Sequence, residues 1–363
     1  MNQTSASLYI HIPFCKSKCA YCAFYSQPVE EHWDKLRQYI DRILADTRKF
    51  LDIYCITQVP SIFIGGGTPN ILPDSILSHL LTGLSEIIPN KPREVSIEAN
   101  PEYITKEQLA TLQTHGITRL SIGIQSTQKD ILRIIGRTCG LEEAESGLSI
   151  IRNNWTLDLN LDFIADIPGQ SEEAVLSDVA RIKKIAPDHV SIYCLDTADR
   201  NDFHQRLADR HLSPEEPPDT FSLYKTELRK AGYQRYEISN FAKPGKECLH
   251  NLGYWRLDPY IGIGPGAVST VFDYRLNKPM RICFPASIDE FTFSPAAGRM
   301  GTQDILSTRD FLYEHFIMGL RIREGVNFSQ LSRRFGDQVW EIQNKLKADI
   351  SSEYMEFSRS SCS

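Results

Sequence analysis

The segment Tyr9-Ile-His-Ile-Pro-Phe-Cys15-Lys-Ser-Lys-Cys19-Ala-Tyr21-Cys22 joins a short β-type run to three closely spaced cysteines. The run Leu8–Ile12 predicts a buried strand, and the loop after it has the spacing C-x3-C-x2-C. Three thiolates on one tight loop can bind three irons of a cubane cluster and leave the fourth iron without a protein ligand. That open iron can bind an organic ligand, as open metal positions do at catalytic sites. We therefore predict a [4Fe–4S] cluster on Cys15, Cys19 and Cys22.

Two alternatives remain open on spacing alone. A tetrahedral zinc site would need a fourth ligand, for which His11 is the nearest candidate, and zinc sites favour paired C-x2-C units. The three cysteines could also be free thiols in a buried loop. The chain's six other cysteines are too scattered to indicate a disulfide framework; they are Cys55, Cys139, Cys194, Cys248, Cys283 and Cys362.

Outward from this segment, β-type runs alternate with amphipathic helical patterns. The predicted strands are Leu8–Ile12, Val59–Ile64, Val95–Glu98, Leu120–Ile124, Leu157–Phe163 and His189–Cys194. The predicted helices are Glu30–Phe50, Asp74–Ile87, Lys106–Thr114, Gln128–Ile135 with Leu141–Arg152, and Glu172–Ile185. Alternation of this kind predicts an α/β fold with a parallel sheet built from right-handed βαβ units. The expected closure is a partial barrel, with an open doubly wound sheet as the alternative.

Both architectures gather chemistry at the carboxyl ends of the strands. The cysteine loop follows the first strand, and residues with chemical potential follow or end each of the others. These residues are Gly65–Gly67, Glu98, Gln125, Asp162 and Tyr193. We expect them to lie at one edge of the sheet, around one site.

The second half of the chain is less regular. Residues 199–219 are charged and rich in proline, which predicts a connection outside the core. Helical patterns follow at Thr220–Ala231, Phe311–Arg321 and Phe328–Leu346, on either side of a Gly-, Pro- and aromatic-rich stretch, Tyr236–Ser269. We expect three parts: residues 1–198, residues 199–300, and a small helical unit at 301–363.

Composition excludes two classes of partner. The formal net charge of -6 and the absence of a basic block argue against a nucleic-acid partner held by phosphate contacts. The sequence contains no run of about 18 apolar residues, so it predicts no membrane-spanning helix. The first residues lack the pattern of a secretory signal, so we expect a cytoplasmic protein.

The motifs, taken in order, resemble the radical S-adenosylmethionine (SAM) superfamily, in its coproporphyrinogen dehydrogenase-like branch. Besides the cysteine segment, the resemblance rests on eight further motifs along about two-thirds of the chain. They are Phe63-Ile-Gly-Gly-Gly-Thr-Pro69, Ser96-Ile-Glu-Ala-Asn-Pro101, Leu120-Ser-Ile-Gly-Ile-Gln-Ser126, Gly136-Arg137, Asn160-Leu-Asp162 with Ile167-Pro-Gly-Gln170, Pro187-Asp-His-Val-Ser-Ile-Tyr193, Gly232-Tyr-x-Arg-Tyr-Glu-Ile-Ser-Asn-Phe-Ala242, and Asp258-x-x-Ile-Gly-Ile-Gly-Pro-Gly-Ala267.

The resemblance implies a partial (β/α)6 radical SAM barrel over residues 1–198 with a smaller, α-rich C-terminal domain. It implies that the cluster binds SAM through its open iron and, on reduction, yields a 5′-deoxyadenosyl radical, for which flavodoxin or ferredoxin would be the electron donor. It also implies SAM contacts from residues of several strands and loops: Tyr9, Tyr21, Gly66, Gly67, Thr68, Glu98, Gln125, Arg137 and Asp162.

Within the branch, two features favour the haem chaperone group, whose members bind haem and transfer it to acceptor haemoproteins. The decarboxylases of the branch have a fourth cysteine two residues after the third, where this chain has Phe24. The segment His250-Asn-Leu-Gly-Tyr254-Trp255 resembles the H-N-x-x-Y-W motif of the chaperones. His250 offers an axial iron ligand, while Tyr254 and Trp255 offer aromatic faces for a macrocycle. Oxygen-independent coproporphyrinogen III oxidase and radical SAM methyltransferase remain alternative functions, so enzymatic activity is left open.

Four residues at three sites depart from the family pattern. Cys139 and Val268 each stand where histidine is usual, and Ala165-Asp166 replaces Tyr-Gly. We expect Asp166 to place an acidic side chain beside the site. These departures bear on partner interaction and turnover rather than on the cluster.

Overall fold

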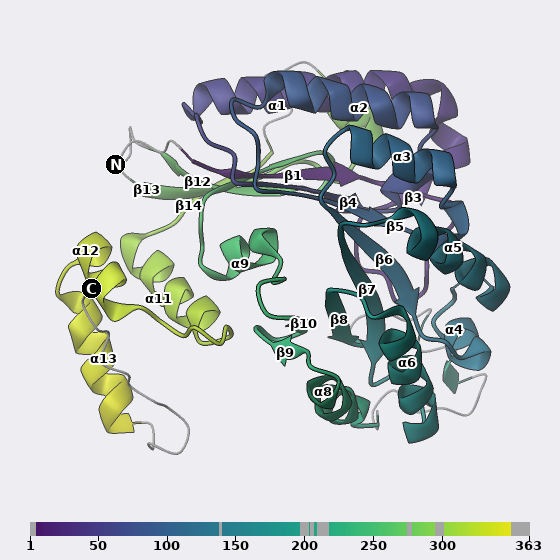
Figure 1. The fold of residues 1–363 in the computed structure, drawn as a ribbon. Helices are drawn as coiled ribbons and strands as arrows, with labels where there is room; N and C mark the ends of the chain where they lie inside the picture. Colours follow the sequence, from purple (N-terminus) through teal and green to yellow (C-terminus); the bar gives the residue numbers. More distant parts are fainter. Residues whose placement is uncertain are drawn as a thin grey trace.

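The structure is a computed structural model, drawn as a ribbon in Figure 1. It describes residues 5–137, 140–196, 203, 207–208, 218–273, 278–294 and 301–349. Cys139, Cys362 and most of the expected connection at 199–219 lie outside these residues.

Six parallel strands form the centre of the sheet, as predicted. They are β1 (Ser7–Ile12), β4 (Ser61–Gly66), β5 (Glu94–Ala99), β6 (Arg119–Gln125), β7 (Asp158–Ala165) and β8 (His189–Cys194). They pair in chain order, with Leu8 opposite Ile62 and Asn160 opposite His189. Their apolar side chains, such as Ile10 and Leu161, are fully buried. The parallel βαβ architecture is therefore confirmed.

Helices cover the outer face of this sheet (Figure 1). They are α1 (Leu36–Ile53), α2 (Asp74–Ile87), α3 (Lys106–Thr114), α4 (Lys129–Ile134), α5 (Leu141–Asn154) and α6 (Glu172–Ile185). The first predicted helix, Glu30–Phe50, is a 3₁₀ turn over Val29–Lys35 that continues into α1. Side-chain oxygens of Thr105 and Ser171 cap α3 and α6 by accepting the backbone N–H of Gln108 and Ala174.

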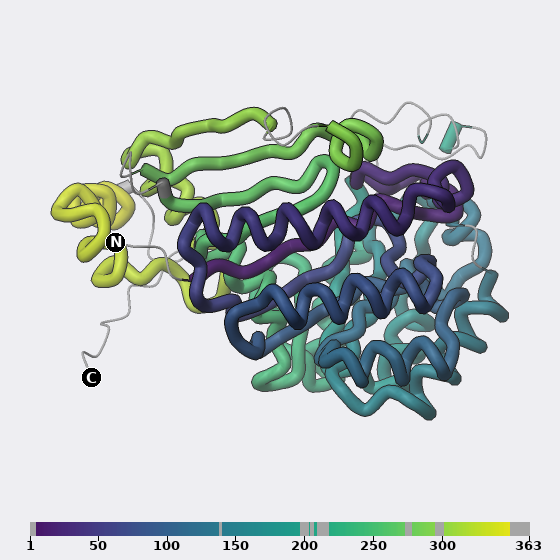
Figure 2. The backbone as a smooth tube through the Cα atoms, turned by 90° about the horizontal axis from the view of Figure 1, so that it is seen from above, coloured from purple at the N-terminus to yellow at the C-terminus, as the bar shows by residue number. Residues whose placement is uncertain are grey.

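The sheet continues past the six expected strands at both edges. On the β1 side, β11 (Tyr260–Ile263) pairs parallel to β1 and is followed by β12 (Val268–Asp273), β13 (Lys278–Cys283) and β14 (Gln303–Ile305). On the β8 side, β10 (Asn240–Ala242) and β9 (Gln234–Arg235) pair antiparallel. Most strands of residues 199–300 thus extend the sheet of residues 1–198. Figure 2 shows the added strands β12–β14 lying alongside α1.

Two further helices flank the inner and lower parts of the fold. Helix α8 (Thr220–Lys230) packs on α6, while α9 (Leu249–Trp255) lies on the inner face, opposite α1–α3 (Figure 1). Within the expected connection, the described residues Phe203 and Leu207 are fully buried against Ile135 and Ile164. For these two side chains the prediction of a segment outside the core was wrong, because local charge masked their apolar spacing.

The last helices form a small unit with its own apolar cluster of Leu312, Phe316, Leu331 and Val339. Helix α11 (Thr308–Gly319) corresponds to the predicted Phe311–Arg321. The predicted helix Phe328–Leu346 is instead two helices, α12 (Phe328–Phe335) and α13 (Gln338–Asp349). They separate at Gly336, whose φ of 75° a right-handed helix excludes. Among the described residues, no helix has the length and apolar character that crossing a membrane requires.

Close packing of α5 against the loop after β5 generates a prediction about stability. A β-carbon at Gly147 would overlap the backbone carbonyl of Pro101, whereas one at Gly253 in α9 would meet only Asp258 at 3.9 Å. Gly147→Ala should therefore lower the free energy of unfolding by about 1–3 kcal/mol despite the better helix propensity of alanine. Gly253→Ala should be neutral or stabilising. Urea denaturation of the two variants checks this, and equal stabilities would contradict it.

Candidate functional site

A cavity of about 890 Å³ lies on the inner face of the sheet. Its lining runs from the cysteine loop, at the carboxyl ends of the strands, to residues that begin β6 and β8 and to the start of α9. Nearly all of the predicted site residues line it: Tyr9, Cys15, Cys19, Tyr21, Cys22, Gly66, Gly67, Thr68, Glu98, Gln125, Arg137, Asp162, His250 and Tyr254. Trp255, half-buried, is not part of the lining. The structure thus brings the residues predicted for SAM, for the cluster and for haem, other than Trp255, into one cavity.

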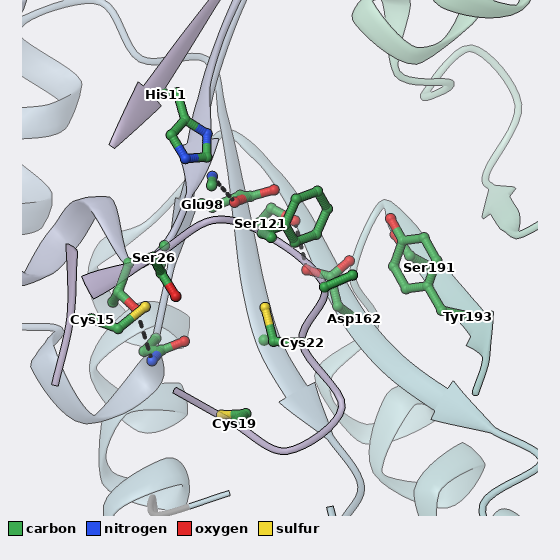
Figure 3. Close-up of a pocket in the computed structure, with 18 of the residues that line it drawn as sticks. His11, Cys15, Cys19, Cys22, Ser26, Glu98, Ser121, Asp162, Ser191 and Tyr193 are labelled. Carbon is green, nitrogen blue, oxygen red and sulfur yellow. Dashed lines mark hydrogen bonds between the residues drawn. The ribbon is translucent and has the colours of Figure 1, made fainter. Parts of the chain in front are cut away.

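The cysteine loop begins in the short strand β2 (Phe14–Cys15) and is closed by β3 (Gln27–Pro28), which pairs with β2. Figure 3 shows Cys15, Cys19 and Cys22 on this loop, near the ends of the strands that carry Glu98 and Asp162. The Thr68 hydroxyl donates to Cys15 Sγ at 3.6 Å. All three thiols are partly exposed. Their donor chemistry fits a cluster whose fourth iron faces the cavity.

The alternative of a zinc ion fits less well. His11, the candidate fourth ligand, is buried, and both ring nitrogens are engaged: Nδ1 accepts from the Tyr9 hydroxyl at 2.8 Å, and Nε2 donates to the Tyr25 carbonyl at 3.0 Å. In the described part of the chain, no three His, Cys, Asp or Glu side chains converge on one ion. A cubane does not require such convergence, because each cysteine binds a different iron.

The glycine triplet fastens the cysteine loop to the sheet. Gly67 N–H donates to the Ile12 carbonyl at 2.8 Å, and Gly66 N–H donates to Glu98 Oε2 at 2.9 Å. A β-carbon at Gly67 would lie 2.7 Å from the Phe14 carbonyl oxygen, and Gly66 has a φ of 114°. The glycines are thus required by the protein's own close packing as well as by any ligand that approaches them.

Two partly buried carboxyl groups lie at the cavity, Glu98 on β5 and Asp162 on β7. Burial is the main cause that raises the pKa of Glu98 to about 7, with Asp162 contributing and the Gly66 N–H opposing. Burial also raises the pKa of Asp162, against hydrogen bonds from Ser121 Oγ at 2.9 Å and Asn160 Nδ2 at 2.8 Å. Glu98 therefore titrates close to neutral pH, where a ligand with N–H or O–H donors would favour its ionised form.

Gln125 and Arg137 occupy constrained positions beside these carboxyl groups. Gln125 has a φ of 69° at the irregular end of β6, a left-handed conformation that non-glycine residues seldom adopt. Arg137 Nη2 donates to Asn100 Oδ1 at 2.9 Å and to the Gly123 carbonyl at 3.0 Å. Asn100, just after β5, and Gly123, within β6, therefore fix the planar guanidinium group at the cavity.

Helix α9 presents His250 from below the strands. The ring is buried, its Nδ1 lies 3.0 Å from Ser61 Oγ, and it packs between Phe63 and Tyr254 with ring centroids 5.3 and 4.8 Å away. His250 Nε2 has no hydrogen-bond partner among the described residues and is shielded from solvent. Burial lowers the pKa of His250 to about 3, so the imidazole is neutral.

The start of α9 is bound by residues that the sequence did not single out. Glu94, the first residue of β5, accepts the backbone N–H of Leu249 at 3.0 Å and of His250 at 3.1 Å. Its carboxylate also accepts from Arg119 Nε at 3.2 Å. In the sequence, the only sign of this arrangement was that Glu94 and Arg119, of opposite charge, begin two consecutive strands. Their common target, more than a hundred residues later, could not be inferred from it.

The residues that depart from the family pattern differ in whether they line the cavity. Asp166 does not line the cavity, because its carboxylate accepts the backbone N–H of Thr220 at 2.9 Å and of Phe221 at 3.0 Å at the start of α8. The expected acidic side chain at the site is therefore a helix cap instead. Val268 does line the cavity, as does Phe24, which is 61% exposed on the cysteine loop.

Comparison with known proteins agrees with this geometry. The family model of the radical SAM superfamily matches residues 9–182, and that of the HemN C-terminal domain matches residues 306–361. The solved structure of coproporphyrinogen III oxidase (HemN) from Escherichia coli has a TM-score of 0.80 with 22% identity, covering 97% of this chain and 86% of that one. At that identity the likeness shows the fold, which is the HemN-like radical SAM fold.

Two bacterial relatives identify the family more closely. The haem chaperone HemW of Buchnera aphidicola subsp. Acyrthosiphon pisum is 34% identical, over 87% of this chain and 82% of its own length. The haem chaperone HemW of Escherichia coli strain K12 is 36% identical, over 72% of this chain and 69% of its own length. This chain therefore belongs to the HemW family of the radical SAM superfamily.

Proposed function

We propose that this protein is a haem chaperone: it binds haem in the cavity, at α9, and passes it to acceptor haemoproteins. The observation that carries the proposal is that one cavity joins the three-cysteine loop to the buried, neutral His250. Oxidative decarboxylation of coproporphyrinogen III is the weaker candidate, because Phe24 stands where the decarboxylases have a further cysteine.

At the carboxyl ends of the strands, Cys15, Cys19 and Cys22 would hold a [4Fe–4S] cluster and leave one iron for SAM. Glu98, Gln125, Arg137 and Asp162 would bind SAM from β5, β6, the loop after α4, and β7, while Tyr9, Tyr21 and residues 66–68 would pack beside it. When bound and reduced, the cluster supplies the electron that cleaves the sulfonium of SAM. Flavodoxin or ferredoxin would then be the donor, in a reducing compartment such as the cytoplasm.

At α9, the hydrogen bonds of His250 suit an axial iron ligand. Ser61 Oγ donates to Ser7 Oγ at 2.9 Å, so it accepts from His250 Nδ1–H and leaves a lone pair on Nε2. A hydrogen bond at the opposite nitrogen is the arrangement that orients metal-binding histidines. Tyr254 packs edge-on against the His250 ring, so its aromatic side chain would lie beside a macrocycle bound there.

Binding of SAM should depend on the ionisation of Glu98. With a pKa of about 7, the carboxyl is mostly protonated at pH 6 and ionised at pH 8, so affinity should rise about tenfold between these values. Calorimetric titration of the reconstituted protein across this range checks the slope. Glu98→Gln should bind more weakly and without the slope, and an unchanged slope in that variant would assign the titration to another group.

Loss of His250 should weaken haem binding. We expect His250→Ala to lower haem affinity by roughly tenfold or more and to change the Soret band, because the axial nitrogen is removed. His115→Ala, at the C-cap of helix α3 and outside the cavity lining, is the matched control and should bind as the wild type does.

Spectrophotometric titration with haem provides the measurement. Equal affinity and equal spectra for His250→Ala and the wild type would remove His250 from the haem site. Release of carbon dioxide from coproporphyrinogen III by the reconstituted protein would favour the decarboxylase instead.

A further inference from the structure

The inner face of β6, β7 and β8 is mostly polar, with Ile164 as an apolar exception at the carboxyl end of β7. Alternate residues of a strand share one face, and here the pairs that line the cavity are Arg119 with Ser121, Asn160 with Asp162, and His189 with Ser191. The interiors of closed barrels are usually filled by branched apolar side chains. A polar inner face beside a large cavity therefore indicates a ligand with polar groups that reaches past the carboxyl ends of the strands.

At the end of this face farthest from the cysteine loop, Arg119 makes hydrogen bonds through two of its three guanidinium nitrogens. Its side chain is 4% exposed. Nε donates to Glu94 at 3.2 Å, while Nη2 donates to Asp158 at 3.2 Å and to the carbonyl oxygens of Lys246 and Glu247 at 3.0 and 3.4 Å. Nη1 has no hydrogen-bond partner among the described residues. Buried donors without partners are rare in folded proteins and call for a physical explanation.

Arg119, whose Nη1 lacks a partner, and His250, whose Nε2 lacks one, are joined at one end of the cavity through Glu94. The Glu94 carboxylate joins them, because it accepts both from Arg119 Nε and from the backbone N–H of His250. Both unpartnered atoms, Nη1 of Arg119 and Nε2 of His250, are shielded from solvent. A ligand bound at His250 would thus lie close to a guanidinium group whose Nη1 has two N–H groups without acceptors.

The other cationic side chains that line the cavity do not offer this combination. Lys16 and Lys18 are exposed on the cysteine loop, at the opposite end. Arg137 lies among the predicted SAM residues, where its Nη2 is held by Asn100 and Gly123. Arg119 is therefore the cation that a ligand bound at α9 would meet.

We propose that Arg119 is a ligand-binding residue that receives a carboxylate side chain of the tetrapyrrole bound at His250. The inference rests on the proposed haem-binding function and deepens it: α9 and β6 together would recognise a metallated macrocycle with free acidic side chains. Arginine suits this role because its planar fork donates to carboxylates and keeps its charge when buried.

The test compares ferric haem with its dimethyl ester, in which both carboxylates are blocked. The wild type should bind haem roughly tenfold or more tightly than the ester, because a charge-assisted bond is lost. In Arg119→Gln the two affinities should become equal, and Arg119→Lys should keep part of the preference. Arg133→Gln, an exposed arginine of α4, is the matched control and should discriminate as the wild type does. The ligand-side comparison in the wild type holds even where an Arg119 variant folds poorly.

Each outcome decides between the claims. If the wild type binds neither compound, the proposed haem function fails and the inference falls with it. If both bind equally to the wild type but weakly to His250→Ala, the haem function stands and the role of Arg119 is wrong. A preference for the free acid that persists in Arg119→Gln assigns carboxylate recognition to another cation, such as Lys16 or Lys18, and also overturns the inference.

Discussion

The site depends above all on the parallel pairing of β1 with two neighbours, β4 on one side and β11 on the other. Ile10 is opposite Ile64 in one strand and Ile263 in the other. This double pairing places the N-terminal cysteine loop beside the glycine triplet after β4. It also brings in residues from beyond position 250, so that α9 and β11 line the same cavity as the cysteines. Backbone hydrogen bonds within the sheet thus bring the two halves of the site together, and side-chain contacts such as those of Glu94 then hold α9 in place.

Charged and polar side chains lie on the inner face of this sheet, where they line the cavity. The buried charges of Glu94 and Arg119 are tolerated because they are paired, and the partly exposed Asp158 pairs in turn with Arg119 and Lys246. The Glu94 carboxylate also caps α9, which fixes the helix that carries His250. Among the buried side-chain atoms without hydrogen-bond partners in the described residues, Nη1 of Arg119 and Nε2 of His250 are the two that we propose to meet the ligand. Buried polar atoms without a hydrogen-bond partner are expected where a ligand supplies the partner on binding.

Much of the architecture could be predicted from the sequence because the central strands are continuous apolar runs separated by amphipathic helices. The carboxyl-edge rule then located Cys15, Glu98, Gln125 and Asp162 at one cavity. The strands β9–β14 were not predicted, since they are short and lie among glycines and prolines. Contacts across long sequence distances, such as Glu94 with the start of α9, leave no periodic signal. For the same reason Asp166, which caps α8, was mistaken for a residue at the site, and the place of Trp255 outside the cavity lining was not foreseen.

The central claim is that Cys15, Cys19 and Cys22 hold a [4Fe–4S] cluster with one iron open to SAM. Mössbauer spectroscopy of the anaerobically reconstituted, ⁵⁷Fe-enriched protein, with and without SAM, tests it most directly. We expect one cubane for each chain and a change in the isomer shift of a single iron site when SAM is added. Both should be absent from a variant in which the three cysteines are alanine. A site that takes up zinc but no iron, or a cluster whose four irons are unaffected by SAM, would contradict the claim.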